Sequence, residues 1–331
     1  MDKQIKMVPE GVNKIDNLKI FSYPTRLAAA WKADILEINI PSYEIYRPAI
    51  EIVTEEGISN TSKTGNILKK IYAKISAPIE LGDKYFLDTR YETDKNIAHI
   101  LKNIAPGLLA SKHFPPKIPE ITVVLKANAC EMAKTAYQLL GFPVLCTDKN
   151  VKGKVITAPT GRFGQYEIWY PELFGKLSFE GYIADTPKRV FISRKGNRGL
   201  TNESDIEDLL QDYGFKKFYY EDIPIPLQWS ITRNAEMMVA IHGAALGSLV
   251  FNQKRLKLIE LFHPGYVTHA FRQMTYAVGG SWCGVTGQIT ENVIKELDFN
   301  HKARAFAMSP TTIDIKSLTM ALDYMKVNKV N

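Results

Sequence analysis

Three cations follow one predicted strand in the second half of the chain. Arg194, Lys195 and Arg198 lie in a loop that also contains two glycines. The apolar run 189–193 precedes this loop, and a helix predicted over 203–213 and capped by Asn202 follows it. Arginine can bind a diphosphate through two parallel hydrogen bonds, and glycine lets the backbone approach the phosphate oxygens closely. The loop therefore has the residue types of a diphosphate site, with a solvated basic turn as the alternative.

The turn at 242–246, which reads His-Gly-Ala-Ala-Leu, is a second candidate. It follows the apolar run 237–241, and its small residues allow a sharp turn into a helix, whose N-terminal N–H groups attract anions. Glu260 lies near the end of the next apolar run, where a carboxylate could accept hydrogen bonds from ribose hydroxyls. A structural histidine in a tight turn, and a Glu260 paired with Arg255 or Lys257, are the alternatives.

The first half of the chain offers two candidates for a general base. Asp94 and His99 lie five residues apart around the start of a predicted helix, 93–109. A base must come within hydrogen-bond reach of the hydroxyl that it deprotonates, and this spacing does not place the two side chains on one helix face. Spacing alone favours a helix-capping aspartate and a surface histidine.

Strands and helices alternate around these residues. The apolar runs of the second half are 189–193, 217–220, 237–241 and 257–261. They are separated by helical patterns, as in a doubly wound parallel sheet. In the first half, the runs 121–125 and 144–147 flank a predicted helix, 130–140, and indicate a second parallel sheet. Because ligands of such α/β sheets bind beyond the carboxyl ends of the strands, the basic loop and the His242 turn are expected at one edge.

A chain of 331 residues is long enough for two domains. The regular pattern weakens between 151 and 177, which places a boundary there. We expect an N-terminal domain over 1–177 and a C-terminal domain over 178–300. A helix within 301–331 is expected to pack back on the N-terminal domain.

The composition, 45% apolar and 23% charged, is that of a globular protein. The net charge of +7 comes from basic residues spread along the chain, which favours a basic cleft over a nucleic-acid-binding stripe. Three distant cysteines without zinc-site spacing, and few carboxylate pairs, lead us to expect no metal. With no apolar stretch of membrane-spanning length and no signal-peptide pattern, a cytoplasmic protein is expected, with peripheral membrane association left open.

These residues resemble the signature of glycosyltransferase family 61. The matching segments are 96–99, 192–203, 241–251 and 259–264. They are similar to the family's N-x-x-H segment, its SR…R…NE block, its HGAGLTN-x-x-F turn and its x-E-L-x-P strand. Ala245 stands where the family usually has a second glycine, and Asn103 stands where it usually has an acid.

The resemblance implies a GT-B architecture, in which two Rossmann-like α/β domains face a cleft. It implies an inverting, metal-independent glycosyltransferase without a cofactor, which moves a sugar from a UDP sugar such as UDP-xylose or UDP-N-acetylglucosamine to a glycan hydroxyl. His99 is then the candidate base, with Asp94 as the second candidate. The residues assigned to the donor nucleotide sugar are Arg194, Lys195, Arg198, Asn202, His242, Gly243, Ala244, Ala245, Leu246 and Glu260.

Two alternatives come from other classes of protein. A non-catalytic homologue that binds a nucleotide or a sugar is suggested by Asn103 and Ala245. A nucleotide-dependent oxidoreductase could use the same sheet edge, although the chain has no GxGxxG fingerprint.

Overall fold

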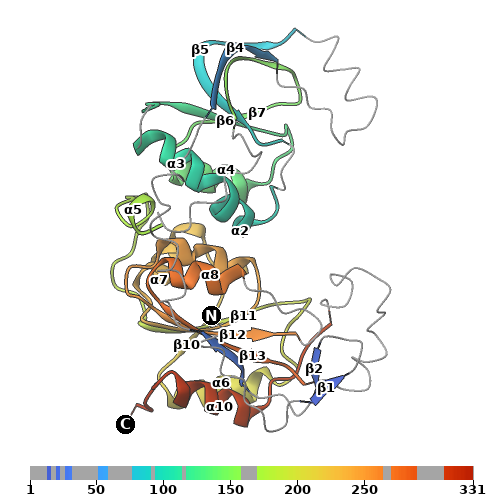
Figure 1. Cartoon of the computed structure of the whole chain (residues 1–331), viewed down its shortest axis with the longest axis vertical. Coiled ribbons are helices and arrows are strands. Elements are labelled where there is room, and N and C mark those ends of the chain that lie inside the picture. Colours follow the sequence, from blue (N-terminus) through green and yellow to red (C-terminus); the bar gives the residue numbers. More distant parts are fainter. Residues whose placement is uncertain are drawn as a thin grey trace. The chain divides into compact units, whose positions relative to one another are not determined.

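The strands of the computed structural model form a separate large sheet in each of two units (Figure 1). Unit 1 consists of Met1–Ile40 together with Ile183–Asn331, and unit 2 consists of Pro41–Tyr182. The residues that the structure describes are 77–90, 94–113, 117–157, 170–263, 270–288 and 309–330, with the backbone of four strands nearer the N-terminus.

Unit 1 is built on a six-stranded sheet in the order β10-β9-β11-β12-β13-β3. Its strands are β3 (Leu27–Trp31), β9 (Arg189–Ser193), β10 (Lys216–Tyr219), β11 (Met237–Ile241), β12 (Lys257–Phe262) and β13 (Ser281–Thr286). The five strands from the second half run parallel, and β3 pairs antiparallel with β13 at the edge. A separate hairpin joins β1 (Asn13–Ile15) to β2 (Ile20–Ser22). The central strands β11 and β12 are almost entirely apolar because helices cover both of their faces.

Helices cover both faces of this sheet (Figure 1). On one face, α6 (Glu203–Asp212) packs beside α10 (Ile315–Tyr324). On the other, the 3₁₀ helix η5 (Ala244–Phe251) packs against α7 (Ile225–Asn234) and α8 (Ala270–Ala277). The unit is therefore a three-layer α/β fold, which confirms the parallel sheet predicted for the second half.

The C-terminal helix α10 differs from its predicted position. Its buried residues Leu318, Ala321 and Leu322 belong to the same apolar core as Val285 on β13. The helix thus packs on the sheet of unit 1, because its apolar stripe completes the layer begun by α6. The first forty residues also belong to unit 1. The sequence analysis instead predicts that they belong to the N-terminal domain, 1–177. The division between Tyr182 and Ile183 lies close to the expected boundary at 177.

Unit 2 contains a five-stranded sheet in the order β4-β8-β5-β6-β7. Its strands are β4 (Glu51–Ile58), β5 (Ile79–Asp88), β6 (Ile121–Leu125), β7 (Val144–Cys146) and β8 (Val151–Thr157). All except β4 run parallel. The helix α4 (Glu131–Leu139) connects β6 to β7, and the short α5 (Tyr170–Leu173) follows β8. Among the described residues of both units, no helix is long and apolar enough to cross a membrane.

The helix predicted at 93–109 starts later and continues farther than expected. It comprises α2 (Ile97–His99), a π-helical turn, η2 (Ile100–Ile104), and α3 (Ala105–His113). Asn96 caps it, since its Oδ1 accepts the N–H groups of Ala98 at 3.0 Å and His99 at 3.4 Å. Proline within a helix normally ends or bends it, yet α3 continues through Pro106. The wider π turn directly before it accommodates a residue that cannot donate a backbone hydrogen bond.

Gly280, between α8 and β13, allows a close backbone approach. A Cβ at this position would lie 2.4 Å from the carbonyl oxygen of Leu256 and 3.1 Å from that of Thr275. Because both oxygens belong to the backbone and cannot rotate away as a side chain can, Gly280→Ala must push Gly280 apart from the backbone at Leu256 and Thr275. We expect it to lower the free energy of unfolding by about 1–3 kcal/mol in chemical denaturation. Ser281→Ala, at the next and half-buried position, is the control, and equal stability of the two variants would contradict this account.

Candidate functional site

The carboxyl ends of the parallel strands of unit 1 bring Arg194 to the His242 turn. Arg194 directly follows β9, and His242 directly follows the neighbouring strand β11. A Cβ at Gly243 would lie 2.9 Å from Nη1 of Arg194. The guanidinium therefore lies against the Cα of Gly243, at a distance that only a glycine allows without displacing it. The structure thus joins the two segments that the sequence nominates for a diphosphate.

Backbone donors add to this contact where η5 begins. The N–H groups of Ala244 and Ala245 donate to no acceptor among the described residues, and both residues are half-buried. The N–H of Leu246 donates to the carbonyl of Gly243 at 3.1 Å, and the Leu246 side chain is buried. Leu246 therefore shapes the turn, whereas Ala244 and Ala245 offer N–H groups beside a guanidinium. This combination of donors suits an anion.

The basic loop contains an unusual backbone conformation at Arg198. Its φ of +65° lies in the left-handed region, which residues other than glycine rarely adopt. Gly196 has a similar φ of +72°, and its carbonyl accepts the N–H of Gly199 at 3.2 Å. Strained backbone of this kind clusters in ligand-binding loops, so Arg198 stays a candidate for the diphosphate.

Two of the predicted donor residues, Lys195 and Asn202, have side-chain partners within unit 1. Lys195 forms a 2.6 Å ion pair with Asp222, whose hydrogen bond raises the pKa of the lysine. The Asn202 side chain forms two hydrogen bonds with the backbone of Ile313. Its Nδ2 donates to the Ile313 carbonyl at 2.8 Å, and its Oδ1 accepts the Ile313 N–H at 3.1 Å. Asn202 therefore precedes α6 without capping it through its side chain. Among the described residues, no hydrogen bond or ion pair joins the side chain of Lys195 or Asn202 to that of Arg194.

Glu260 forms a buried cluster with His242 and Trp282. Its Oε1 lies 2.5 Å from Nδ1 of His242, and its Oε2 accepts the indole N–H of Trp282 at 2.7 Å. The carboxylate is fully buried, and the ribose contact of Glu260 stays a prediction. Its burial follows from its register on β12, where it shares the face covered by α8 with Phe262. Trp282 is the partner that the sequence analysis missed.

Aromatic rings and one further cation surround this cluster. The His242 ring stacks on Phe262 and tilts against Phe271, with centroid distances of 5.2 Å in each case. The guanidinium carbon of Arg272 lies 5.9 Å from the Trp282 ring. Burial lowers the pKa of Arg272, and the charge of Glu260 acts in the opposite direction. The His242 ring is therefore held by the Glu260 carboxylate and by two aromatic rings.

In unit 2, the two candidate bases have different surroundings. The Asp94 carboxylate accepts the N–H of Cys130, at the start of α4, at 3.0 Å, and the Asp94 carbonyl accepts the Cys130 thiol at 2.8 Å. Asp94 thus holds the N-terminus of α4 and does not cap its own helix. His99 is half-buried, and no hydrogen bond or ion pair to its ring occurs in the described part of the chain. Of the two, His99 is the better candidate for a base.

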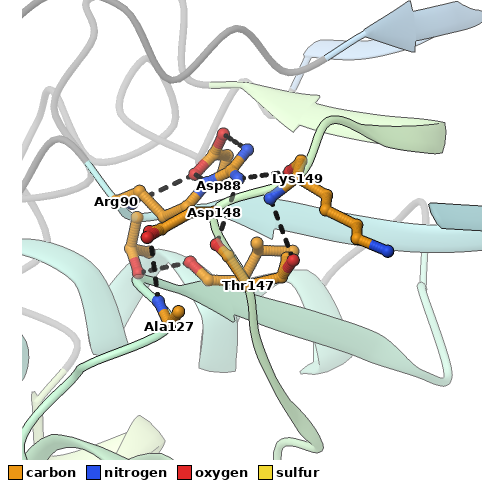
Figure 2. A network of polar contacts seen from close by, with 8 residues as sticks. Asp88, Arg90, Ala127, Thr147, Asp148 and Lys149 are labelled. Carbon is orange, nitrogen blue, oxygen red and sulfur yellow. Dashed lines mark hydrogen bonds and ion pairs between the residues drawn. The ribbon is translucent and has the colours of Figure 1, made fainter. Parts of the chain in front are cut away.

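A buried arginine, not nominated by the sequence, organises the same edge of unit 2 (Figure 2). Nε and Nη2 of Arg90 donate to the two carboxylate oxygens of Asp88 at 2.9 and 2.8 Å. Its Nη1 donates to the carbonyls of Thr147 at 3.2 Å and Lys149 at 2.7 Å. The contacts tie the loop after β5, which leads to Asp94 and His99, to the loop after β7. The sequence feature that could have identified this residue is an arginine two positions after the aspartate that ends a predicted strand.

The described residues contain no group of three or more His, Cys, Asp or Glu side chains that could hold a metal ion. The three cysteines are free thiols. Burial raises the pKa of the Cys283 thiol, so that it stays protonated in the core.

A search of curated proteins finds no similar sequence. The family model named Glycosyltransferase 61 matches residues 61–259, which is more than half of the chain. The matched region includes the edge of unit 2 that carries Arg90 and His99, and the Arg194–Gly243 contact of unit 1. The chain therefore belongs to the glycosyltransferase 61 family.

Proposed function

We propose that the protein is an inverting, metal-independent glycosyltransferase that uses a nucleotide sugar. The donor class is a UDP sugar such as UDP-xylose or UDP-N-acetylglucosamine, and the acceptor is a glycan hydroxyl. The observation that carries the proposal is the Arg194 guanidinium packed on Gly243 beside the N–H groups of Ala244 and Ala245. Membership of the family supports sugar transfer as the reaction. The Arg194–Gly243 contact supports a diphosphate-binding site at this turn.

The proposed reaction is a direct displacement at the sugar's anomeric carbon. The acceptor hydroxyl forms the new glycosidic bond, and the bond to the diphosphate breaks with its electron pair leaving on the phosphate oxygen. The hydroxyl proton passes to a base, for which we propose His99. Arg194 and the two backbone N–H groups stabilise the negative charge that develops on the leaving diphosphate.

We further propose that the two units divide the substrates as in GT-B enzymes. Unit 1 takes the donor, because its sheet edge carries Arg194 and the His242 turn. Unit 2 takes the acceptor, because its sheet edge carries His99 on helix α2, which follows the segment that Arg90 fixes. Parallel sheets in both units support this division.

Thermal unfolding with UDP, GDP, CMP and NAD, each with and without Mg²⁺, tests the proposal. A ligand at a hundred times its Kd adds about 2.7 kcal/mol to the stability of the protein, which raises Tm by several degrees. We expect UDP to raise Tm equally with and without Mg²⁺. A shift with NAD alone would favour an oxidoreductase and overturn the proposal. UDP binding without hydrolysis or transfer of any UDP sugar would indicate a non-catalytic homologue.

Gly243→Ala tests the contact itself. Because the added Cβ meets only the far end of the Arg194 side chain, the fold should tolerate it while the guanidinium moves. We expect an unchanged Tm and UDP binding weakened by about tenfold, or roughly 1.4 kcal/mol, in calorimetric titration. In an Arg194→Ala background the same change should cost nothing further, since the displaced group is gone. An equal loss in both backgrounds would show that Gly243 acts without Arg194.

A further inference from the structure

Three buried side chains form a continuous chain of hydroxyl groups behind the turn that follows β11. The Tyr220 hydroxyl, in the 3₁₀ turn η4 (Tyr220–Asp222), lies 2.7 Å from Oγ1 of Thr232 on α7. That oxygen lies 2.8 Å from Oγ of Ser248 on η5, and the Ser248 hydroxyl donates to the Ala245 carbonyl at 2.8 Å. We call Tyr220, Thr232 and Ser248 the hydroxyl chain, and all three are buried.

The hydroxyl chain has one direction that places a proton on each of its contacts. A hydroxyl has a single proton and a carbonyl can only accept, so Ser248 must donate to Ala245. Thr232 must then donate to Ser248, and Tyr220 to Thr232. Burial raises the pKa of Tyr220, so its hydroxyl keeps the proton that it donates. The other acceptor within reach of Thr232 is the carbonyl of Gln228, at 3.0 Å on its own helix.

The last hydrogen bond of the chain acts on the peptide groups of the turn. The Ala245 carbonyl and the Leu246 N–H belong to one peptide group, and that N–H donates to the Gly243 carbonyl at 3.1 Å. This group is therefore held at both ends. The Gly243 carbonyl in turn belongs to the peptide that carries the Ala244 N–H. Because the C=O and N–H of a trans peptide point in opposite directions, the Ala244 N–H is directed out of the turn.

Apolar packing around the hydroxyl chain does not require these hydroxyls. α7 and η5 already pack through Trp229 and Phe251, whose rings stack with a centroid distance of 4.4 Å. A buried hydroxyl costs free energy unless it is hydrogen-bonded, and phenylalanine, valine and alanine would fill nearly the same volume without that cost. A fully connected polar network, however, specifies one arrangement of the backbone more narrowly than apolar packing does. The hydroxyl chain therefore adds a defined geometry at the turn.

We propose that the hydroxyl chain positions the backbone of the turn, so that the N–H groups of Ala244 and Ala245 stay directed at the nucleotide diphosphate. Its three members are positioning residues that act through the Ala245 carbonyl and do not touch the nucleotide. None of them belongs to the residues assigned to the donor by resemblance. This assignment rests on the proposed function, because it requires a diphosphate at the turn.

UDP and uridine are the two probes that test the assignment. Calorimetric titration would measure UDP, and competition with UDP would measure uridine, which has no phosphate. We expect Ser248→Ala to weaken UDP binding about 5- to 10-fold, the effect of losing one hydrogen bond. Thr232→Val should have a smaller effect and Tyr220→Phe less than about a twofold effect, because they act through Ser248. Uridine should bind each variant as it binds the wild-type protein.

Thermal stability should follow a different order from UDP affinity. Thr232→Val leaves the Tyr220 hydroxyl without this acceptor in the core, so it should have the lowest Tm of the three variants. In the Ser248→Ala background, Thr232→Val should cause no further loss of UDP affinity. If Thr232→Val does not fold, its combination with Tyr220→Phe removes the unpaired hydroxyl and tests the same contact.

Thr275→Val is the matched control for loss of a buried hydroxyl. Thr275 lies on α8, is fully buried, and donates to the Phe271 carbonyl of its own helix at 2.7 Å. Its hydroxyl is not part of the hydroxyl chain. Thr275→Val should therefore lower Tm without changing UDP affinity.

The outcomes distinguish the two proposals. UDP binding that needs Arg194 but is unchanged in Ser248→Ala would overturn this assignment and leave the proposed function intact. Equal losses for UDP and uridine would also overturn it, since the effect would then not concern the diphosphate. Additive losses in the Ser248→Ala and Thr232→Val double variant would show that Thr232 does not act through Ser248. Absence of UDP binding in the wild-type protein would overturn the proposed function and this assignment together.

Discussion

Arg194→Ala is expected to lower kcat/KM for sugar transfer about 100- to 1000-fold, the usual loss when one preorganised donor to a developing oxyanion is removed. The guanidinium is packed on Gly243 at the turn, beside the N–H groups of Ala244 and Ala245. Initial rates of UDP release from a UDP sugar measure the effect. Arg194→Lys should recover part of the activity, because a lysine keeps the charge but not the paired N–H geometry.

Lys195→Ala is the matched control for Arg194→Ala. It removes a cation from the next position, where the side chain is more than half exposed and paired with Asp222. We expect less than about a threefold change, because exposed ion pairs contribute under about 1 kcal/mol. A similar loss in both variants would mean that the loop acts through its total charge and not through the Arg194–Gly243 contact.

Asn252→Leu is expected to destabilise the protein by about 3 kcal/mol or more, since each buried backbone group left without a partner costs about 1–3 kcal/mol. The buried amide donates to the carbonyls of Thr232 and Ala235, both at 2.8 Å. Its oxygen accepts the N–H groups of Lys254 at 3.0 Å and Leu256 at 3.2 Å. One side chain thus joins the end of α7 to the segment that enters β12.

Chemical denaturation followed by circular dichroism measures this loss. Asn252→Asp keeps the shape and the acceptor oxygen but removes the two N–H donors of the amide, so it should also be strongly destabilised. Gln253→Ala, at the exposed neighbouring position, should change the free energy of unfolding by less than about 0.5 kcal/mol. A stable Asn252→Leu variant would show that the four backbone groups find other partners.

The strands that lead to the Arg194–Gly243 contact were predictable because their signal is local. The predicted runs 189–193 and 237–241 have the same bounds as β9 and β11. A buried parallel strand must be apolar along its whole length, so five consecutive residues are enough to identify it. The place of Arg194 and His242 at one sheet edge followed from the order of strands and helices alone.

The partners of the site residues were not predictable, because they come from distant parts of the chain. Trp282 lies 22 residues beyond Glu260 on the next strand, and only the register of β12 on β13 brings them together. Asn202 binds Ile313 across 111 residues, and Arg90 binds Thr147 across 57. A strand pattern shows that a residue is buried, but it does not show what lies opposite.

The discontinuous composition of unit 1 has a consequence for the order of folding. Unit 2 is a single continuous segment, so all of it has left the ribosome before most of unit 1 has been synthesised. β3, near the start of the chain, pairs with β13, and their register sets Trp31 opposite Trp282. β3 can therefore pair with β13 only after most of the chain has been synthesised. Closing so long a loop makes completion of this sheet a late event, and the neighbour of Glu260 is put in place by the same step.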